Sequence, residues 1–147
     1  MTNITARLLP STMALLKSPG VDARVIAFAI ALAIACEIHP LNNPRVLKYL
    51  KNTFNVEEEA RNDWYRHWVK LGFAALETRL SQSPLTGAYC VGDTPTLADV
   101  CLVPQVFNGK RLDVAVEDYP TLARIFEHCM AQEAFQRAAP AAQPDAA

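Results

Sequence analysis

The sequence contains few of the residues and motifs that mark β-hairpins or metal sites. Its five glycines are outnumbered by ten prolines, and the Asn-Gly pair, Asn108-Gly109, follows a helical pattern instead of joining two alternating strands. The three histidines and four cysteines form no HExxH or CxxC motif, so no metal site is predicted. The cysteines are widely spaced, and we expect them to be small buried side chains in a reducing compartment.

A strong net charge and a long apolar run are also missing. The formal net charge of −1 gives no general attraction to nucleic acid or to an anionic membrane. The longest apolar run, residues 25–36, is shorter than the ~20 residues that a membrane span needs and starts too late for a signal peptide. We therefore expect a cytoplasmic protein without nucleic-acid or membrane partners.

Helical patterns account for most of the chain. With 147 residues, of which 51% are apolar and 20% charged, the composition is typical of one globular domain. Ser18 and Pro19 predict the start of a helix over about 19–38, which is apolar all round and therefore expected to be buried on most sides. Five further helices are predicted. One starts after the cap Asn43, with Pro44 in its first position, and one covers about 56–80 after the cap Asn55. The others start after Thr96, cover about 120–131, and lie at EAFQRAA. No strand is predicted, and the fold class is all-α.

The predicted helix over 56–80 carries apolar residues at helical spacing. Two tryptophans and a tyrosine in it could form a surface that stacks nucleic-acid bases, but the acidic start VEEEA and the missing basic patch favour core packing. The predicted core stripe comprises Ala60, Trp64, Trp68, Leu71, Ala75, Leu76 and Leu80.

The stretch GDTPTLADVCLVPQ, residues 92–105, contains the start of a core helix. The Thr96 hydroxyl can accept a hydrogen bond from the Asp99 amide, while the Asp99 carboxylate accepts one from the Thr96 amide. This is a capping box, so we expect Asp99 to be structural rather than catalytic. Pro104 is expected to kink the helix.

Several of these stretches together resemble a known domain family. They closely resemble the C-terminal helical domain of zeta-class glutathione transferases, a class that includes maleylacetoacetate and maleylpyruvate isomerases. The stretches that carry the resemblance are YCVGDTPTLADVCLVPQVFN, IACEIHPLNNPRVLKYL, GFAALE, YPTLARI and EAFQRAAPAAQPDA. The resemblance covers about residues 21–146. It implies a glutathione transferase C-terminal-like bundle of about five to six helices over 19–139, an irregular or partly helical segment over 1–18, and a mobile tail over 140–147.

The resemblance also implies a reaction, the glutathione-dependent cis–trans isomerisation of maleyl dicarboxylates. In this family a thioredoxin-like N-terminal domain binds glutathione and stabilises its thiolate with a Ser-Ser-Cys motif, and the helical domain adds the far wall of the substrate site. The sequence has no Ser-Ser-Cys motif. We therefore expect a helical domain that lacks its catalytic partner, binds glutathione weakly by itself and is inactive as an isolated chain.

The resemblance assigns four site residues and no catalytic one. His39, Asn42 and Asn43 match loop positions near glutathione and the subunit interface, and Arg111 matches an arginine that faces the acidic substrate. A guanidinium suits a dicarboxylate because it is planar, always charged and bidentate. Two simpler interpretations stay open: Arg111 as a solvated surface charge, and His39 as a helix C-terminal cap beside Pro40.

Two further functions stay open beside the isomerase domain. One is a non-catalytic helical module that dimerises or binds a partner, such as a second copy or a separate thioredoxin-like domain. The other is a loose binder of apolar or acidic small molecules. We expect the helix over 21–38 to present an apolar surface, which the N-terminal segment can partly cover with Ile4, Leu8, Leu9, Met13, Leu15 and Leu16.

Overall fold

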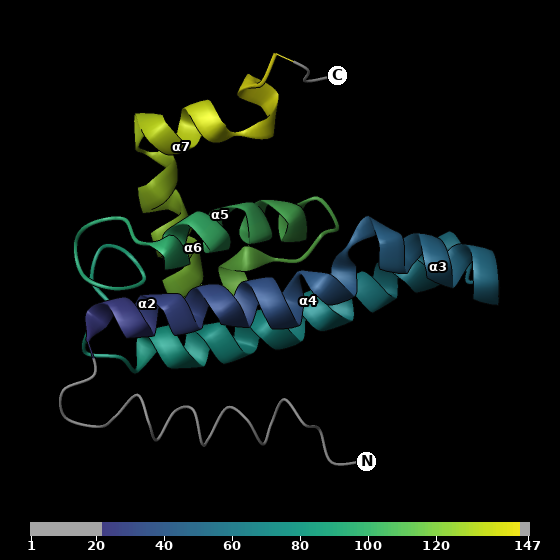
Figure 1. Cartoon of the computed structure of the whole chain (residues 1–147), viewed down its shortest axis with the longest axis horizontal. Coiled ribbons are helices and arrows are strands. Elements are labelled where there is room, and N and C mark those ends of the chain that lie inside the picture. The colour runs from purple at the N-terminus through teal and green to yellow at the C-terminus, as the bar shows by residue number, and fades with distance from the viewer. Residues whose placement is uncertain (1–21, 145–147) are drawn as a thin grey trace.

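The computed structural model describes residues 22–144, and in this range the chain folds into helices without a strand. One isolated bridge, between Thr86 and Gly92, interrupts the loop that precedes α5. The elements (Figure 1) are α2 Ala23–Leu32, the π-helical η1 Ala33–Ile38, the 3-10 helix η2 Pro40–Asn42, α3 Pro44–Phe54, α4 Glu58–Ser81, α5 Leu97–Lys110, η3 Val116–Asp118, α6 Pro120–Met130, α7 Glu133–Ala138 and η4 Pro140–Ala142. The all-α prediction is confirmed. The interpretation of residues 1–18 and the Ser18 cap lie outside the described residues.

The core lies where α4, α5 and α6 meet one another. α2 packs against α5, while η1 and η2 pack against α4. Gly72 permits the close approach of α4 to η1, because a Cβ atom there would lie 2.4 Å from Ile38 Cδ1. The largest fully buried side chains are Phe73, Leu80, Leu102, Leu122 and Ile125. By contrast α3 has no buried residue, and it extends at one end of the long axis (Figure 1).

The buried face of α4 differs from the predicted stripe. The structure buries Tyr65, Val69, Phe73, Leu76 and Leu80. Only the last two belong to the predicted set, in which Ala60 and Leu71 are exposed while Trp64, Trp68 and Ala75 are partly exposed. The two stripes are neighbours on one helix and both have helical spacing, so spacing alone could not choose between them. The tryptophans lie at the rim of the core, where an indole N–H can reach a polar partner.

α2 is buried on one face only, so the prediction of burial on most sides was wrong. Its core residues include Ile26 and Ile30, whereas Val25, Phe28 and Leu32 are exposed. Packing against α5 covers one side, and no described element covers the other. The expectation that all four cysteines are buried was also wrong in part. Cys90 and Cys129 are buried as expected, but Cys101 is half-buried and Cys36 is exposed.

Helix ends follow the sequence signals with two exceptions. The helix predicted from about residue 19 begins at Ala23 instead, and Asp22, expected in its first turn, is its N-cap and accepts a hydrogen bond from the Arg24 amide. Asn43 caps α3, accepting a hydrogen bond from the Arg45 amide, and Pro44 occupies the first helical position as predicted. Asn55 does not cap α4. It ends α3 in the left-handed conformation with φ of 51°, which asparagine tolerates better than most residues, and Glu57 precedes α4 instead.

The helical stretch Ala23–Phe54 is long and apolar enough, by length and composition, to cross a membrane. A core helix of a soluble protein meets the same criteria. In this stretch the isoleucines 26, 30, 34 and 38 pack in the core, so its apolar character is accounted for in part by packing against α4 and α5.

Candidate functional site

The loop His39–Asn43 is held in place by an unusual helix end. The last six residues before it form a π-helix, in which the His39 amide donates to the Ile34 carbonyl oxygen at 2.9 Å. The Asn42 amide then donates to the His39 carbonyl at 3.1 Å. His39 therefore caps η1 with its backbone while its side chain is exposed. Short π-helical turns inside helices are frequent at functional sites.

The two asparagines of the loop occupy different environments. Asn43 is half-buried, and its Oδ1 accepts from the Arg45 amide at 3.1 Å, which leaves its Nδ2 as a donor. Asn42 is only 5% exposed, and within residues 22–144 neither its Oδ1 nor its Nδ2 has a hydrogen-bond partner. A buried carboxamide without partners is uncommon and costly. The loop thus presents His39 and Asn43 more openly than Asn42.

α4 anchors the loop through Trp64, a contact that the sequence did not predict. The Trp64 Nε1–H donates to the Leu41 carbonyl at 2.9 Å. Trp64 also packs edge-on against Trp68, with ring centroids 5.6 Å apart. The indole therefore links the predicted binding loop to the first half of α4.

Arg111 lies at the C-terminal end of α5, exposed, with its amide donating to the Phe107 carbonyl at 3.2 Å. Among the residues that the structure describes, no carboxylate lies within ion-pair distance of its guanidinium. Tyr65 of α4 is close enough to be affected by its charge: burial raises the pKa of Tyr65, and the positive charge of Arg111 opposes this in part. The phenol therefore stays protonated at neutral pH and can donate a hydrogen bond.

The predicted loop thus contacts α4 at Trp64, and the next residue, Tyr65, is affected by the charge of Arg111. Sequence reasoning missed Tyr65, although its i, i+4 and i+8 relation to Val69 and Phe73 defines the face that is buried.

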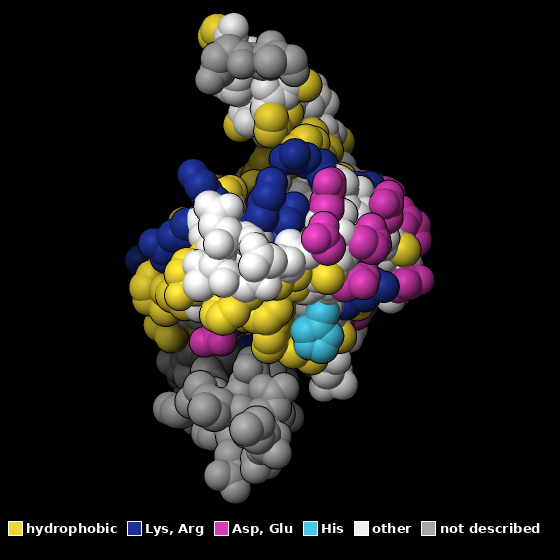
Figure 2. All heavy atoms as spheres, turned by 90° about the vertical axis from the view of Figure 1, so that its right-hand side faces the viewer, with side chains coloured by type: hydrophobic (Ala, Val, Ile, Leu, Met, Phe, Trp, Pro, Cys, Tyr) yellow, Lys and Arg dark blue, Asp and Glu magenta, His cyan; other side chains and the backbone are white. Residues whose placement is uncertain are grey.

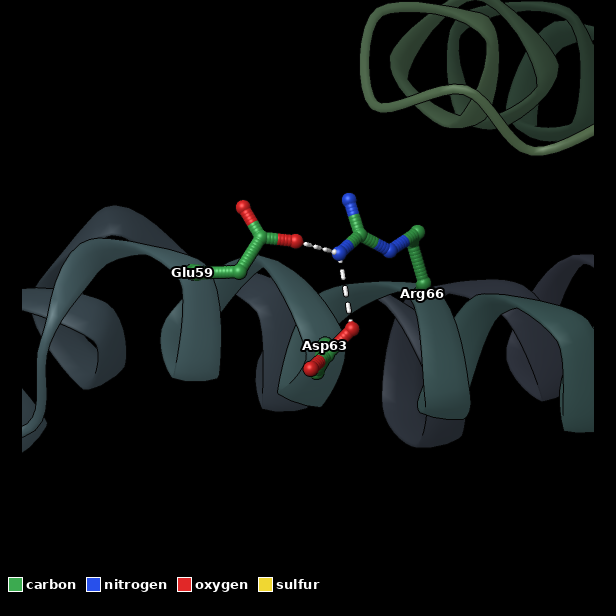
Figure 3. Close-up of polar contacts among 3 residues, drawn as sticks. All are labelled: Glu59, Asp63 and Arg66. Atoms are coloured by element: carbon green, nitrogen blue, oxygen red, sulfur yellow. Dashed lines mark hydrogen bonds and ion pairs between the residues drawn. The ribbon is translucent and has the colours of Figure 1, made fainter.

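Arg66, the next residue of α4, is already paired with two carboxylates. Its guanidinium donates to Glu59 and, at 2.7 Å, to Asp63 (Figure 3). Both carboxylates raise the pKa of Arg66, their hydrogen bonds contributing most. A guanidinium that is held this way is poorly placed to bind an external anion, so Arg111 is the better candidate of the two.

Acidic and basic side chains are distributed unevenly over the end of the molecule near α3. Figure 2 shows most of the acidic side chains on one side of this face and most of the Lys and Arg side chains toward its centre and other side. Arg45, Lys48 and Lys51 are exposed on α3, which directly follows the loop. Their positive charge favours the approach of an anionic ligand.

Thr96 and Asp99 form a capping box at the start of α5. Asp99 is fully buried. Its Oδ2 accepts from the Thr96 amide at 2.8 Å and from the Thr96 hydroxyl at 2.7 Å, and its Oδ1 accepts from the Cys90 amide at 2.8 Å. The bond to Cys90 was not predicted, and it ties the loop before α5 to the helix. Both carboxylate oxygens are engaged inside the protein, as suits a structural group.

The buried cysteines are not placed as nucleophiles. Burial and, to a smaller extent, the Asp99 carboxylate raise the pKa of Cys90 far above its usual range and the pKa of Cys129 to about 12. Both thiols are therefore neutral at physiological pH. Within the described part of the chain, no three His, Cys, Asp or Glu residues are grouped to hold a metal ion.

Known proteins resemble the chain over most of its length. Residues 66–133 match the family model "Glutathione S-transferase, C-terminal domain". A probable maleylacetoacetate isomerase of Vibrio cholerae is 50% identical over 118 residues, which are 80% of this chain and 54% of that protein.

Two solved structures have the same fold. A holo maleylpyruvate isomerase, a bacterial zeta-class glutathione S-transferase, is 45% identical with a TM-score of 0.84, covering 88% of this chain and 61% of that one. A maleylacetoacetate isomerase from Methylobacterium extorquens AM1, with bound malonate and GSH, is 36% identical with a TM-score of 0.82, covering 85% and 58%.

The chain spans little more than half the length of the curated relative and of these two solved chains. The match falls on the helical domain, in agreement with the all-α fold and the order of the motifs. The chain belongs to the family of the glutathione S-transferase C-terminal domain.

Proposed function

We propose that this chain forms the substrate side of a glutathione-dependent cis–trans isomerase that acts on maleyl dicarboxylates, with Arg111 binding a substrate carboxylate. The observation that carries the proposal is the exposed Arg111 guanidinium, which has no ion-pair partner in the described range. The relative from Methylobacterium extorquens, whose structure holds the dicarboxylate malonate together with GSH, supports the same ligand class.

Tyr65 adds a second donor to the proposed carboxylate site. Its phenol is neutral at physiological pH for the reason given above. A guanidinium and a phenol together can meet one carboxylate with charge-assisted hydrogen bonds, which are shorter and stronger than neutral ones.

The loop fits the glutathione side of such a site. His39 is exposed and Asn43 keeps its Nδ2 as a donor, and both groups can hydrogen-bond a peptide carbonyl or a carboxylate. The chemistry of this reaction also needs a stabilised thiolate. We propose that a thioredoxin-like domain outside the described residues supplies it, and that the isolated chain is catalytically inactive.

The proposal is tested by titrating malonate and maleate into the purified chain while following ¹H–¹⁵N spectra or calorimetric heats. We expect saturable binding that Arg111→Ala abolishes and Arg111→Lys weakens, because lysine keeps the charge but loses bidentate geometry. Tyr65→Phe should weaken binding about three- to tenfold, the loss of one hydrogen bond. Arg124→Ala, which removes an exposed arginine from α6, is the matched control.

Maleylpyruvate isomerisation is assayed on the same samples with glutathione present. We expect no turnover by the isolated chain, and turnover that depends on Arg111 once a thioredoxin-like domain is supplied. Dicarboxylate binding that is unaffected by Arg111→Ala would refute the assigned site. Turnover by the isolated chain would refute the need for a second domain.

A second function is favoured by one specific feature, the exposed apolar side chains Val25, Phe28 and Leu32 on α2. Apolar side chains that cluster on a surface mark interaction sites. We propose as the alternative a non-catalytic helical module that forms a homodimer or binds a thioredoxin-like partner. A stable dimer with no dicarboxylate affinity would favour it over the isomerase domain.

A further inference from the structure

An apolar groove lies at the start of α2, away from the residues of the proposed site. Its walls are the first turns of α2, the loop before α5 and the first residue of α5. Its volume is about 610 Å³, and its lining includes Ala23, Phe28, Leu85 and Leu97. Three of these side chains are large and exposed: Phe28 by 54%, Leu85 by 40% and Leu97 by 51%.

The groove is formed by apolar side chains that lie far apart in the sequence. Its three exposed side chains come from three separate parts of the chain and converge on one concavity. Covering apolar surface is favourable by about 25 cal/mol per Å². A surface of this kind is expected to be covered by an interacting segment.

The described part of the chain begins beside the groove. Asp22 caps α2, and the next two residues, Ala23 and Arg24, line the groove. The segment that precedes Asp22 is therefore joined to the described fold beside the groove. It includes six large apolar side chains, at Ile4, Leu8, Leu9, Met13, Leu15 and Leu16.

The reach of this segment is sufficient. Leu16 precedes Asp22 by six residues, which can span up to about 20 Å at ~3.3 Å per residue. Phe28 follows Asp22 by six helical residues, or about 9 Å along the axis. A tether this short also gives a high effective concentration, so weak contacts are enough to keep the groove covered.

We propose that the segment Met13–Leu16 of this chain packs into the groove and covers Phe28, Leu85 and Leu97. The apolar surface of α2 is then an intramolecular docking site for the N-terminal segment. The proposal goes beyond the isomerase function and does not depend on it, because no residue of the carboxylate site lines the groove.

Limited trypsin digestion of the full chain tests the proposal, because Lys17 lies next to the proposed contact. Cleavage after Lys17 is followed by mass spectrometry and compared with a free peptide of residues 1–21. We expect cleavage at least tenfold slower in the protein, which corresponds to about 1.4 kcal/mol. Phe28→Asp and Leu97→Asp should remove most of this protection.

Val100→Asp is the control, since Val100 is 56% exposed on α5 but does not line the groove. It should leave the cleavage rate unchanged, and thermal unfolding should show that all variants are folded. Cleavage as fast as in the free peptide, or protection that survives both groove variants, would overturn the proposal. Protection that disappears on dilution would also overturn it and would make a second copy of the chain the occupant.

Discussion

Replacing Asp99 tests how the loop before α5 is joined to the core. Asp99→Ala removes the acceptor of three hydrogen bonds, from the Cys90 amide, the Thr96 amide and the Thr96 hydroxyl. Bonds to a charged acceptor contribute about 1.5–3 kcal/mol each, and an unpaired buried donor costs about 1–3 kcal/mol. Since such terms are not additive within one network, we expect a total loss of about 3–5 kcal/mol.

Urea unfolding, followed by the fluorescence of Trp64 and Trp68, measures this loss. For a slope of roughly 2 kcal/mol per M urea, the midpoint should fall by about 2 M. Asp99→Asn keeps the volume and one carbonyl oxygen, so we expect about half the loss. Thr96→Val removes the hydroxyl bond to the Asp99 carboxylate and the acceptor for the Asp99 amide, and should cost about 1–2 kcal/mol.

Two outcomes would show that this account of Asp99 is wrong. The first is a loss below about 1 kcal/mol for Asp99→Ala, since buried hydrogen-bond networks cost more than that to break. The second is additivity of Thr96→Val and Asp99→Asn, because residues that share a hydrogen bond should show coupling. Asp63→Ala is the control, since this carboxylate is largely exposed and should leave the midpoint almost unchanged.

Three further predictions follow from single contacts. Glu77 of α4 accepts hydrogen bonds from the Thr121 and Leu122 amides at 3.0 Å, so Glu77→Ala should lower the urea midpoint by the loss of a helix cap, about 1–2 kcal/mol, while Glu77→Gln keeps one acceptor and should cost less. Asn42→Leu should raise stability by about 1 kcal/mol because it removes a buried carboxamide without protein partners; a fall in the urea midpoint would mean that this carboxamide is paired in solution. For Cys129 the pKa rises from 9.0 to about 12 on folding, so the unfolded chain loses this proton at a lower pH than the folded chain. The stability of the wild type should therefore fall more steeply above pH 9 than that of Cys129→Ala. Equal slopes of stability against pH, from urea unfolding between about pH 8 and 11, would contradict this.

Much of the fold could be predicted because the relevant signals are local. Asn43 with Pro44 marks the start of α3, and Thr96 with Asp99 marks the start of α5, since a capping group and its amide lie within three residues of each other. Asn55 shows the limit of such signals. Asparagine serves both as an N-cap and as a left-handed helix end, and only the backbone conformation shows which role it has here.

The candidate site was predictable in part. The resemblance supplied His39, Asn42, Asn43 and Arg111 as residue numbers, and the capping signal predicted Asn43 as a helix cap, but neither showed that Asn42 is buried. Tyr65 was missed because the effect of Arg111 on it depends on the tertiary structure. No local pattern in α4 indicates that the charge of Arg111, 46 positions later in the sequence, acts on Tyr65.

The sequence by itself determined the all-α class, most helix starts and the family of the domain, because hydrophobic period, capping chemistry and motif order are properties of short stretches. Tertiary structure alone decided which face of each helix is buried. Both stripes on α4 have helical spacing, and the apolar residues of α2 surround the whole helix, so the choice depends on where α5 and η1 pack. Packing of this kind joins residues far apart in the chain. It therefore decides that Phe28 is exposed and that Tyr65 is buried within the influence of the Arg111 charge.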